Sequence, residues 1–425
     1  MLDIKLFRER PDYVRDGMCK VGEAPDVVDD VRAMDERWRD LLSECEQLKA
    51  ERNRQSKKIG GMEEGTARDA LIREMRELGE RIQELDEAAA AARRELDERM
   101  LGIPNIPHED APVGRDESEN VVVRSWGEPP EFDFTPKPHW DLGPELGILD
   151  FERGIKLSGS RFYVLLRDGA RLQRALINWM LDLHVREHGY TEAYPPYIVT
   201  GKCLVGTGNL PKFAENLYRD VEEDLWLIPT AEVPLTNLHR EEILEAGDLP
   251  RCYVACTACF RREKMHAGAD VRGMKRGHQF DKVELMKYVA PGTSDEELER
   301  LIADAEDVCR RLGVPYRIKE MCTGDLSFVA CRKFDIEIWA AGCQEWLEVS
   351  SCSNFRDFQA RRAGIRYRPA GGEGPEFVHT LNGSGVALPR LMIALLENYQ
   401  QPDGTVTVPG VIRPYMGGLE RIEPA

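Results

Sequence analysis

The stretch Phe260–Glu284 reads FRREKMHAGADVRGMKRGHQFDKVE and carries more charge than a structural hairpin needs. Its closing run HQFDKVE alternates in character, and a period of two is typical of a β-strand. Two strands joined by a charged loop would present Arg261, Glu263, Phe280 and Glu284 together. A guanidinium suits phosphate and carboxylates suit amines, while an aromatic ring suits a base, so the stretch indicates a nucleotide site. A solvated charged hairpin is the alternative on this stretch alone.

Residues 27–100 predict two long helices that fold back on each other. Gly60-Gly61 interrupts the apolar periodicity, which favours an antiparallel hairpin of the coiled-coil type. Each helix would extend about 45–50 Å, which suits contact with a distant part of a large ligand. A dimerisation or scaffolding coiled coil is the alternative. The first apolar series comprises Val31, Met34, Trp38, Leu41, Cys45 and Leu48, and the second comprises Leu71, Met75, Leu78, Ile82, Leu85, Ala89, Ala92 and Leu96.

Composition narrows the class of protein. A chain of 425 residues is long enough for two or three domains. With 42% hydrophobic and 32% charged residues it is expected to be soluble and globular. It has no apolar run of about 18 residues and no apolar secretory segment at its start, so no membrane partner is expected. The eleven scattered cysteines indicate reduced thiols and a cytoplasmic location.

One local cluster of residues is basic although the net charge of the chain is negative. The net charge of −18 taken by itself argues against a nucleic-acid partner, but binding depends on local patches. The cluster falls near the expected tip of the helical hairpin, with only Glu51 opposing it, and is a candidate for phosphate contact. Its members are Lys49, Arg52, Arg54, Lys57 and Lys58.

FRRE followed by HQFDKVE resembles motif 2 of the class II aminoacyl-tRNA synthetases, and in particular of the seryl-tRNA synthetase family. Several ordered segments resemble the same family over nearly the whole chain, which is far more specific than any one motif. These segments are GTGNLPKF (206–213), TAEV (230–233), SSCSNF (350–355), HTLNGSG (379–385) and VIRPYMGG (411–418).

The resemblance implies an α+β protein with three parts. It implies an N-terminal tRNA-binding domain over residues 1–103 that includes the arm, a linker over 104–120, and a catalytic domain with an antiparallel sheet over 121–425. Gly189-Tyr190 followed by Pro196 resembles motif 1, which implies a homodimer. The implied activity is ATP-dependent conversion of L-serine to seryl-adenylate and transfer of serine to the terminal adenosine of serine tRNA. Selenocysteine tRNA stays open as a second substrate.

For ATP, the resemblance implies contacts from motif 2, from motif 3 and from the strand around Glu348. Arg261 would bridge the α-phosphate and the serine carboxylate, because a guanidinium fork suits that role better than an ammonium. Arg390 would contact the far phosphates, and Glu348 would hold Mg²⁺, which in nucleotide sites often binds one or two carboxylates plus phosphates. The full implied ATP set is Arg261, Arg262, Glu263, Phe280, Glu348, Val349, Ser350, Ser351 and Arg390.

For serine, the pocket must hold an ammonium and a hydroxyl. By resemblance, Glu232 would pair with the ammonium and Glu284 would accept from the hydroxyl or the amino group. A site that hydrogen-bonds a hydroxyl rejects alanine strongly, because its buried polar groups would go unpaired. The implied serine set is Thr230, Ala231, Glu232, Glu284, Asn382 and Ser384.

The chain departs from the family pattern in two places. Pro389 precedes Arg390 where glycine is common, and proline fixes φ and removes a donor. In the motif 2 loop, Lys264-Met265-His266 replaces smaller residues and Gly277 stands where a bulkier one is common. These departures affect fine contacts, not the reaction class.

The sequence also raises three alternatives: two other protein classes and a zinc site. A synthetase-like enzyme that loads an amino acid onto a carrier protein would lack the arm. A non-catalytic coiled-coil protein would have lost residues such as Arg261 or Glu284. Cys256 and Cys259 form a lone CxxC, but zinc normally takes four ligands and no second pair follows.

Overall fold

The computed structural model describes residues 1–264, 272–372 and 374–424. They form two compact units, Leu2–Pro104 and the chain from Asn105 onward, with Met1 grouped with the second unit. In these ranges, no helix combines the length and apolarity needed to span a bilayer.

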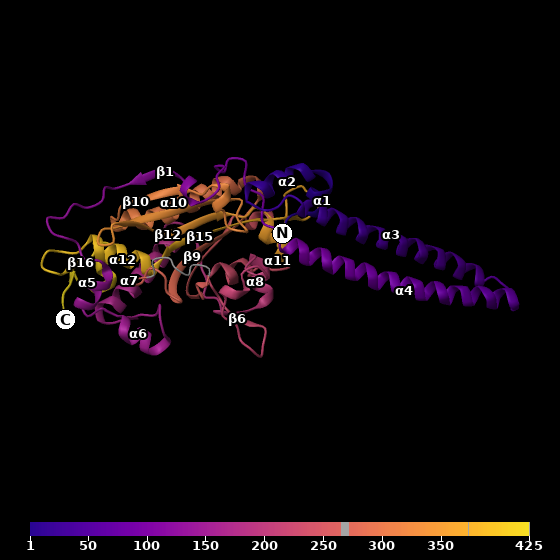
Figure 1. Ribbon diagram of the computed structural model, residues 1–425, viewed down its shortest axis with the longest axis horizontal. Helices are drawn as coiled ribbons and strands as arrows, with labels where there is room; N and C mark the ends of the chain where they lie inside the picture. Colours follow the sequence, from indigo (N-terminus) through magenta and orange to yellow (C-terminus); the bar gives the residue numbers. More distant parts are fainter. Residues whose placement is uncertain (265–271, 373, 425) are drawn as a thin grey trace. The chain divides into compact units, whose positions relative to one another are not determined.

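The N-terminal unit is helical and contains the expected hairpin arm. Helices α3 and α4 run antiparallel beside each other and are joined by a short turn (Figure 1). The 33 residues of α3 correspond to about 50 Å, so the prediction of a long helix pair is confirmed. The helices are α1 (Ile4–Glu9), α2 (Pro11–Lys20), α3 (Val27–Ile59) and α4 (Thr66–Leu101).

The arm is held by a narrow apolar seam. Cys45, Ile82 and Leu85 are buried between the helices, as the apolar spacing predicts. Asp35 is also buried, which the apolar spacing does not predict. Its carboxylate accepts from the Arg8 guanidinium at 2.6 and 2.8 Å and from Arg39 at 2.9 Å. A buried charge is tolerated when it is paired in this way.

In the second unit, eight strands of the described residues form one sheet in the order β1-β10-β11-β12-β15-β9-β8-β4. Neighbouring strands are antiparallel except β4 and β8, which are parallel. The prediction of an α+β protein with an antiparallel sheet is therefore confirmed. The strands are β1 (Val121–Trp126), β10 (Tyr316–Glu320), β11 (Arg332–Ala340), β12 (Glu345–Asn354), β15 (His379–Ala387), β9 (Gln279–Val289), β8 (Arg251–Phe260) and β4 (Thr191–Glu192).

The charged stretch Phe260–Glu284 begins at the last residue of β8 and closes within β9. Phe260 pairs with Gln279 next to the segment that connects the two strands. The strand expected from HQFDKVE is therefore present, and it continues to Val289. Shorter strands pair outside the large sheet: β2 (Leu149–Asp150) with β3 (Val164–Leu165), β5 (Ile198–Thr200) with β6 (Leu225–Leu227), β13 (Arg366–Arg368) with β7 (Ile243–Glu245) and β14 (Glu376–Phe377), and β16 (Val406–Thr407) with β17 (Arg421–Ile422).

Helices α7, α10 and α12 pack on the sheet and share its main apolar core. Because side chains alternate along a strand, β9 sends Val283 and Leu285 into this core and Phe280 and Lys282 to a cavity. The helices of this unit are α5 (His139–Glu145), α6 (Phe151–Ser158), α7 (Arg167–Arg186), α8 (Gly201–Thr207), α9 (Glu232–Thr236), α10 (Ser294–Leu312), α11 (Phe358–Ala363) and α12 (Leu388–Asn398).

Candidate active site

A cavity of about 500 Å³ opens over the middle of the large sheet. Strands β9, β12 and β15 supply its floor, and the segments around Thr230 and Arg261 supply its walls. Most of the residues predicted from the sequence line this one cavity although they come from distant parts of the chain. They are Thr230, Glu232, Arg261, Glu263, Phe280, Glu348, Val349, Ser351, Asn382, Ser384 and Arg390.

At one end of the cavity, polar side chains form a closed hydrogen-bond network. Thr230 Oγ1 donates to Glu284 Oε2 at 2.7 Å, and Asn382 Nδ2 donates to Glu284 Oε1 at 3.1 Å. Glu284 is completely buried and also pairs with the Lys282 ammonium. Asn382 Nδ2 further donates to Glu232 Oε2 at 2.9 Å. Two carboxylates are thus fixed side by side, which suits recognition of a small ligand that carries an ammonium and a hydroxyl.

Glu232 lies in a strongly perturbed environment. Burial, together with repulsion from Glu284, raises the pKa of Glu232 to about 7. A hydrogen bond from Gln359 Nε2 at 2.7 Å acts in the opposite direction. A carboxylate held near its pKa in this way gains strongly from an incoming cation, because the cation offsets the repulsion.

Arg261 stands between this network and the rest of the cavity. Its Nε donates to the Pro229 carbonyl at 3.1 Å, which fixes the direction of the guanidinium. The guanidinium carbon lies 5.2 Å from the centre of the Phe280 ring, within the range of a cation–π contact. Arg261 also lines the cavity, and a guanidinium there suits an anion that binds in it.

Arg390 enters the cavity from the first turn of α12. Its Nη1 donates to the Glu348 carbonyl at 2.6 Å and lies 3.7 Å from Glu348 Oε2. Pro389 occupies the first turn of this helix, where a missing N–H costs nothing because it would have no partner within the helix. The departure from the family pattern at Pro389 is therefore compatible with a regular α12.

Glu348, Asp335 and Lys333 form a compact charged group beside Arg390. Burial, and then repulsion from Glu348, raises the pKa of Asp335 to about 7. Burial would raise the pKa of Glu348, but Arg390, Lys333 and Arg261 outweigh it and hold this pKa below its usual value. Asp335 Oδ1 is buried and has no hydrogen-bond partner among the residues that the structure describes. An orphaned carboxylate oxygen next to a second carboxylate is the donor set that Mg²⁺ prefers, so these residues fit the ion.

Four predicted residues do not line the cavity. Glu284 lies beneath it, in the network described above, and Ala231 is packed in a neighbouring apolar core. Ser350 Oγ donates to the Ser384 carbonyl at 2.5 Å. The Arg262 guanidinium lies 6.0 Å from the centre of the Tyr218 ring. Ser350 can thus act only through the groups that it positions, whereas Glu284 receives three donors and a carboxylate can accept about four, so it has room for one donor from a ligand.

Sequence reasoning missed several cationic and amide groups of the site. Lys282 lies between Phe280 and Glu284 on the same face of β9, and the period of two could have indicated it. Lys333, Arg276 and Gln359 had no such signal. Within the replaced motif 2 loop, Lys264 N donates to Asn216 Oδ1 at 3.1 Å, whereas Met265 and His266 lie outside the described residues.

The CxxC pair lies on β8. Cys256 and Cys259 are three residues apart on a strand, so their side chains point to opposite faces of the sheet. Burial raises the pKa of both thiols. The two sulfurs therefore do not form one half of a zinc site.

At the end of the arm, the basic cluster is only partly neutralised. Lys49 Nζ lies 2.6 Å from Asp86 Oδ1, and Arg54 pairs with Glu51. No carboxylate of the described chain is ion-paired with Arg52, Lys57 or Lys58. These three side chains are the part of the cluster that is available for a polyanion.

Comparison with known proteins gives the class first. Residues 213–399 match the tRNA synthetase class II core domain (G, H, P, S and T). Together with the antiparallel sheet and its cavity, this match defines a class II aminoacyl-tRNA synthetase. Residues 1–107 match the seryl-tRNA synthetase N-terminal domain.

The full-length relatives narrow the class to one family. The serine–tRNA ligase of Thermomicrobium roseum is 63% identical over 99% of this chain and 95% of its own length, and that of a Roseiflexus species is 62% identical over 99% of both chains. The seryl-tRNA synthetase of Pyrococcus horikoshii complexed with ATP superposes with a TM-score of 0.94 at 41% identity over both whole chains. The cytoplasmic serine–tRNA ligase of Naegleria fowleri in complex with AMP gives 0.89 at 34% identity, over 100% of this chain and 99% of that one. The chain belongs to the seryl-tRNA synthetase family.

Proposed function

We propose that the cavity over the large sheet is where this chain, a serine–tRNA ligase, activates L-serine with ATP and esterifies it to serine tRNA. The observation that carries the assignment is that the Arg261 charge acts both on Glu232 in the paired-carboxylate pocket and on Glu348 beside Arg390 in the same cavity. The neighbours at 63% and 62% identity carry the same activity in their names.

In the activation step, the serine carboxylate attacks the α-phosphate of ATP and pyrophosphate leaves. Both reactants are anions, so the site must neutralise the negative charge that gathers at phosphorus. Arg261 is placed to bridge the two, and Phe280 offers a face for adenine. Arg390 extends the positive charge toward the leaving pyrophosphate. Glu263, Val349 and Ser351 complete the cavity-lining ATP contacts, with Arg262 and Ser350 behind them.

A bound Mg²⁺ would supply positive charge to the phosphate side of the cavity. Glu348 is proposed as its protein ligand, with the neighbouring Asp335 and Ser351 able to complete the set. Holding the ion would offset the repulsion between the two carboxylates, which is the physical reason to expect it there.

Serine selection falls to the network at the other end of the cavity. Glu232 would bind the ammonium, and Glu284 would accept from the serine hydroxyl, while Thr230 and Asn382 hold the two carboxylates in place. Ser384 lines the same end, and Ala231 supports it from the core. An amino acid without the hydroxyl would leave Glu284 short of a donor, so alanine is rejected.

In the transfer step, the terminal ribose hydroxyl of tRNA attacks the seryl-adenylate, and no protein nucleophile is needed. We assign tRNA binding to the domain over residues 1–103, with the arm at about 27–100 and the cluster Lys49, Arg52, Arg54, Lys57 and Lys58 on phosphates. Residues 104–120 act as a linker to the catalytic domain over 121–425. Selenocysteine tRNA is a second candidate substrate on the same grounds.

Two further proposals concern assembly and location. The segment that resembles motif 1 exposes Tyr194 and Ile198, with 85% and 53% of their surface accessible, which supports a homodimer through this region. A cytoplasmic location is proposed with the reaction, because its substrates are used in translation.

The decisive experiment measures charging of purified serine tRNA with labelled serine. It compares the intact chain with a variant in which residues 31–96 are replaced by a short linker. We expect the intact chain to charge tRNA and the variant to retain only serine-dependent ATP–pyrophosphate exchange. If neither charges tRNA while both form adenylate, the carrier-protein interpretation replaces this one. Failure of the intact chain to form seryl-adenylate with ATP, Mg²⁺ and serine would refute the proposed function.

A further inference from the structure

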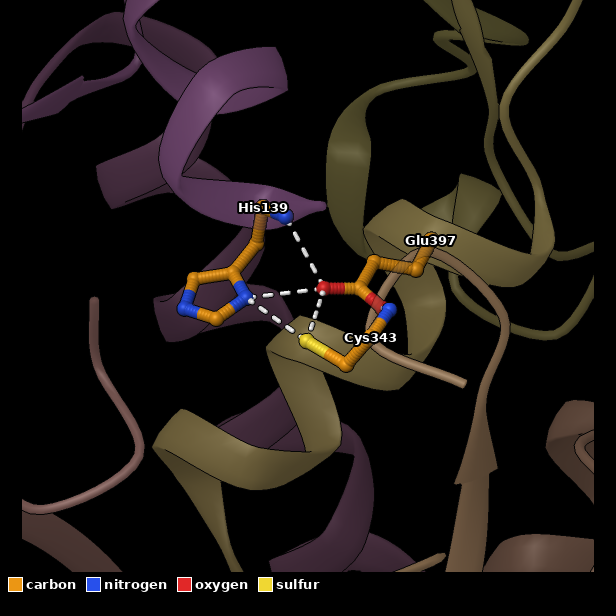
Figure 2. Close-up of side chains that lie close together, drawn as sticks. All are labelled: His139, Cys343 and Glu397. Atoms are coloured by element: carbon orange, nitrogen blue, oxygen red, sulfur yellow. Dashed lines mark hydrogen bonds and ion pairs between the residues drawn. The ribbon is translucent and has the colours of Figure 1, made fainter. Parts of the chain in front are cut away.

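Behind the cavity, three side chains that the proposed mechanism does not use converge in the interior. They come from the start of α5, from the turn before β12 and from the end of α12 (Figure 2). His139 Nδ1 lies 2.8 Å from Glu397 Oε1, and the Cys343 thiol donates to the same oxygen at 3.1 Å. His139 and Glu397 are completely buried.

The hydrogen bonds of His139 decide between a metal site and a purely protein network. The Met274 backbone N–H donates to His139 Nε2 at 3.1 Å, so Nε2 is the acceptor and Nδ1 carries the proton that Glu397 receives. A histidine that binds a metal through Nδ1 needs an acceptor facing its other nitrogen, and here a donor faces it. Burial and the adjacent Glu397 raise the pKa of the Cys343 thiol, so it is not a reactive thiolate.

Glu397 is held as the charged anchor of this network. Burial would raise the pKa of Glu397, but hydrogen bonds from the His139 side chain and backbone N–H outweigh it and keep the pKa below its usual value. Its second oxygen accepts from the Cys343 backbone N–H at 2.8 Å. With both oxygens occupied, Glu397 fixes the ring of His139 in one tautomer and one orientation.

The group that His139 holds in turn is the returning end of the motif 2 loop. Beside Met274, Arg272 and Lys275 lie over the Trp140 ring, at 4.5 and 5.3 Å from its centre. Gly273 has a φ of +70°, and a Cβ there would fall 2.0 Å from His139 Nε2. The dipeptide His139-Trp140 thus clamps this segment, and only glycine permits the close approach.

From this segment, contacts continue into the cavity. The Lys275 carbonyl accepts from Arg390 Nε at 3.3 Å, and Arg276 Nη1 lies 3.6 Å from Glu263 Oε2. Arg390 and Glu397 both belong to α12 and are two helical turns apart, so they face the same side. One face of α12 therefore contacts the loop directly through Arg390 and indirectly through Glu397 and His139.

We propose that His139, anchored by Glu397, is a positioning residue that sets the segment Arg272–Arg276 and thereby the direction of Arg390 on the phosphate side of the cavity. The inference rests on the proposed function, because it assumes that this side of the cavity binds ATP. The serine network around Glu284 has no contact with His139 and should be unaffected.

Two matched substitutions of His139 separate its two hydrogen bonds. His139→Asn keeps a donor for Glu397 but removes the acceptor for the Met274 N–H, whereas the longer His139→Gln carries an acceptor at the reach of Nε2. We expect His139→Asn to raise the KM for ATP in serine-dependent ATP–pyrophosphate exchange about tenfold, the scale of one buried donor left unpaired. The KM for serine should stay within about twofold, and His139→Gln should restore much of the loss. A KM for ATP within about twofold of wild type, or equal rises in both KM values, would overturn the inference.

A loop variant keeps the test valid if the buried substitutions fail to fold. Gly273→Ala pushes the segment away from His139 and should raise the KM for ATP alone. Gly404→Ala is its control, because Gly404 also has a positive φ (+80°) but a Cβ there would meet nothing within 4 Å. If the two variants behave alike, backbone strain explains the effect and the inference fails. Stoichiometric zinc that is lost in Cys343→Ala would overturn it as well, and a wild-type chain without exchange activity would overturn the proposed function first.

Discussion

The arm and the catalytic sheet place their charged residues in opposite environments. In the arm, two helices share a seam a few side chains wide around Cys45, Ile82 and Leu85, and most of their remaining surface is exposed. In the sheet, Glu284 and Lys282 lie inside the protein and pair with each other along β9, and Glu284 also accepts hydrogen bonds from Thr230 and Asn382 of other segments. The arm thus carries most of its charges at its surface, and the sheet holds charges in an interior where each one depends on its neighbours.

The comparison predicts the largest effect for Arg261 in the interior site. Arg261→Ala should lower serine-dependent ATP–pyrophosphate exchange about 10²–10³-fold, because the fork that meets the transition-state charge is lost. Arg261→Lys should fall between, since it keeps the charge but not the fork. A loss of less than about tenfold in Arg261→Ala would mean that this end of the cavity does not carry the chemistry.

A middle-sized effect is expected from pH, again only in the interior. Burial and the adjacent Glu284 raise the pKa of Glu232 from its ordinary value of 4.5 to about 7, so the carboxylate proposed to bind the serine ammonium forms only as the pH rises through about 7. The KM for serine should therefore fall several-fold, up to about tenfold, between about pH 6 and pH 8.

The raised pKa of Glu232 also makes the stability of the folded protein depend on pH. The folded protein holds this proton more tightly than the unfolded chain, so the free energy of unfolding should decrease as the pH rises from about 4.5 to about 7. Glu232→Gln should remove both slopes, as measured by exchange kinetics and by thermal melts across this range. A wild type whose KM for serine is flat with pH would contradict the assigned role of Glu232.

The smallest effect is expected at the arm tip. Replacing Arg52, Lys57 and Lys58 by Gln should raise the KM for tRNA about threefold and reduce the salt dependence of tRNA binding by about 0.7–0.9 per cation removed. Exchange without tRNA should not change. Arg54→Gln is the matched control with a smaller effect, because Arg54 is already paired with Glu51. An altered exchange rate in the triple variant would contradict the proposal that the arm does not affect the chemistry at the sheet.

The sequence predicted the arm almost to its ends because its contacts are local and periodic. The apolar series from Val31 and the break at Gly60-Gly61 match α3 and α4. It did not predict the buried Asp35, whose partner Arg8 comes from another helix. In the cavity, the resemblance named Arg261, Glu232 and Arg390, which the structure brings together, but Lys333 and Asp335 have no local signal. Their charge matters only because β11 pairs with β12 and brings them beside Glu348.

What the sequence alone determined is the α+β class, the long arm, the β8–β9 hairpin and the family, because periodicity and ordered motifs lie along the chain. What only the tertiary structure decided is which charges are buried together. The register of β9 against β15 places Glu284 near Asn382, and the segment before α9 brings Thr230 to the same carboxylate. The packing of α12 places Glu397 against His139. The strength of a charge interaction depends on distance and burial, and neither quantity is written in the order of residues.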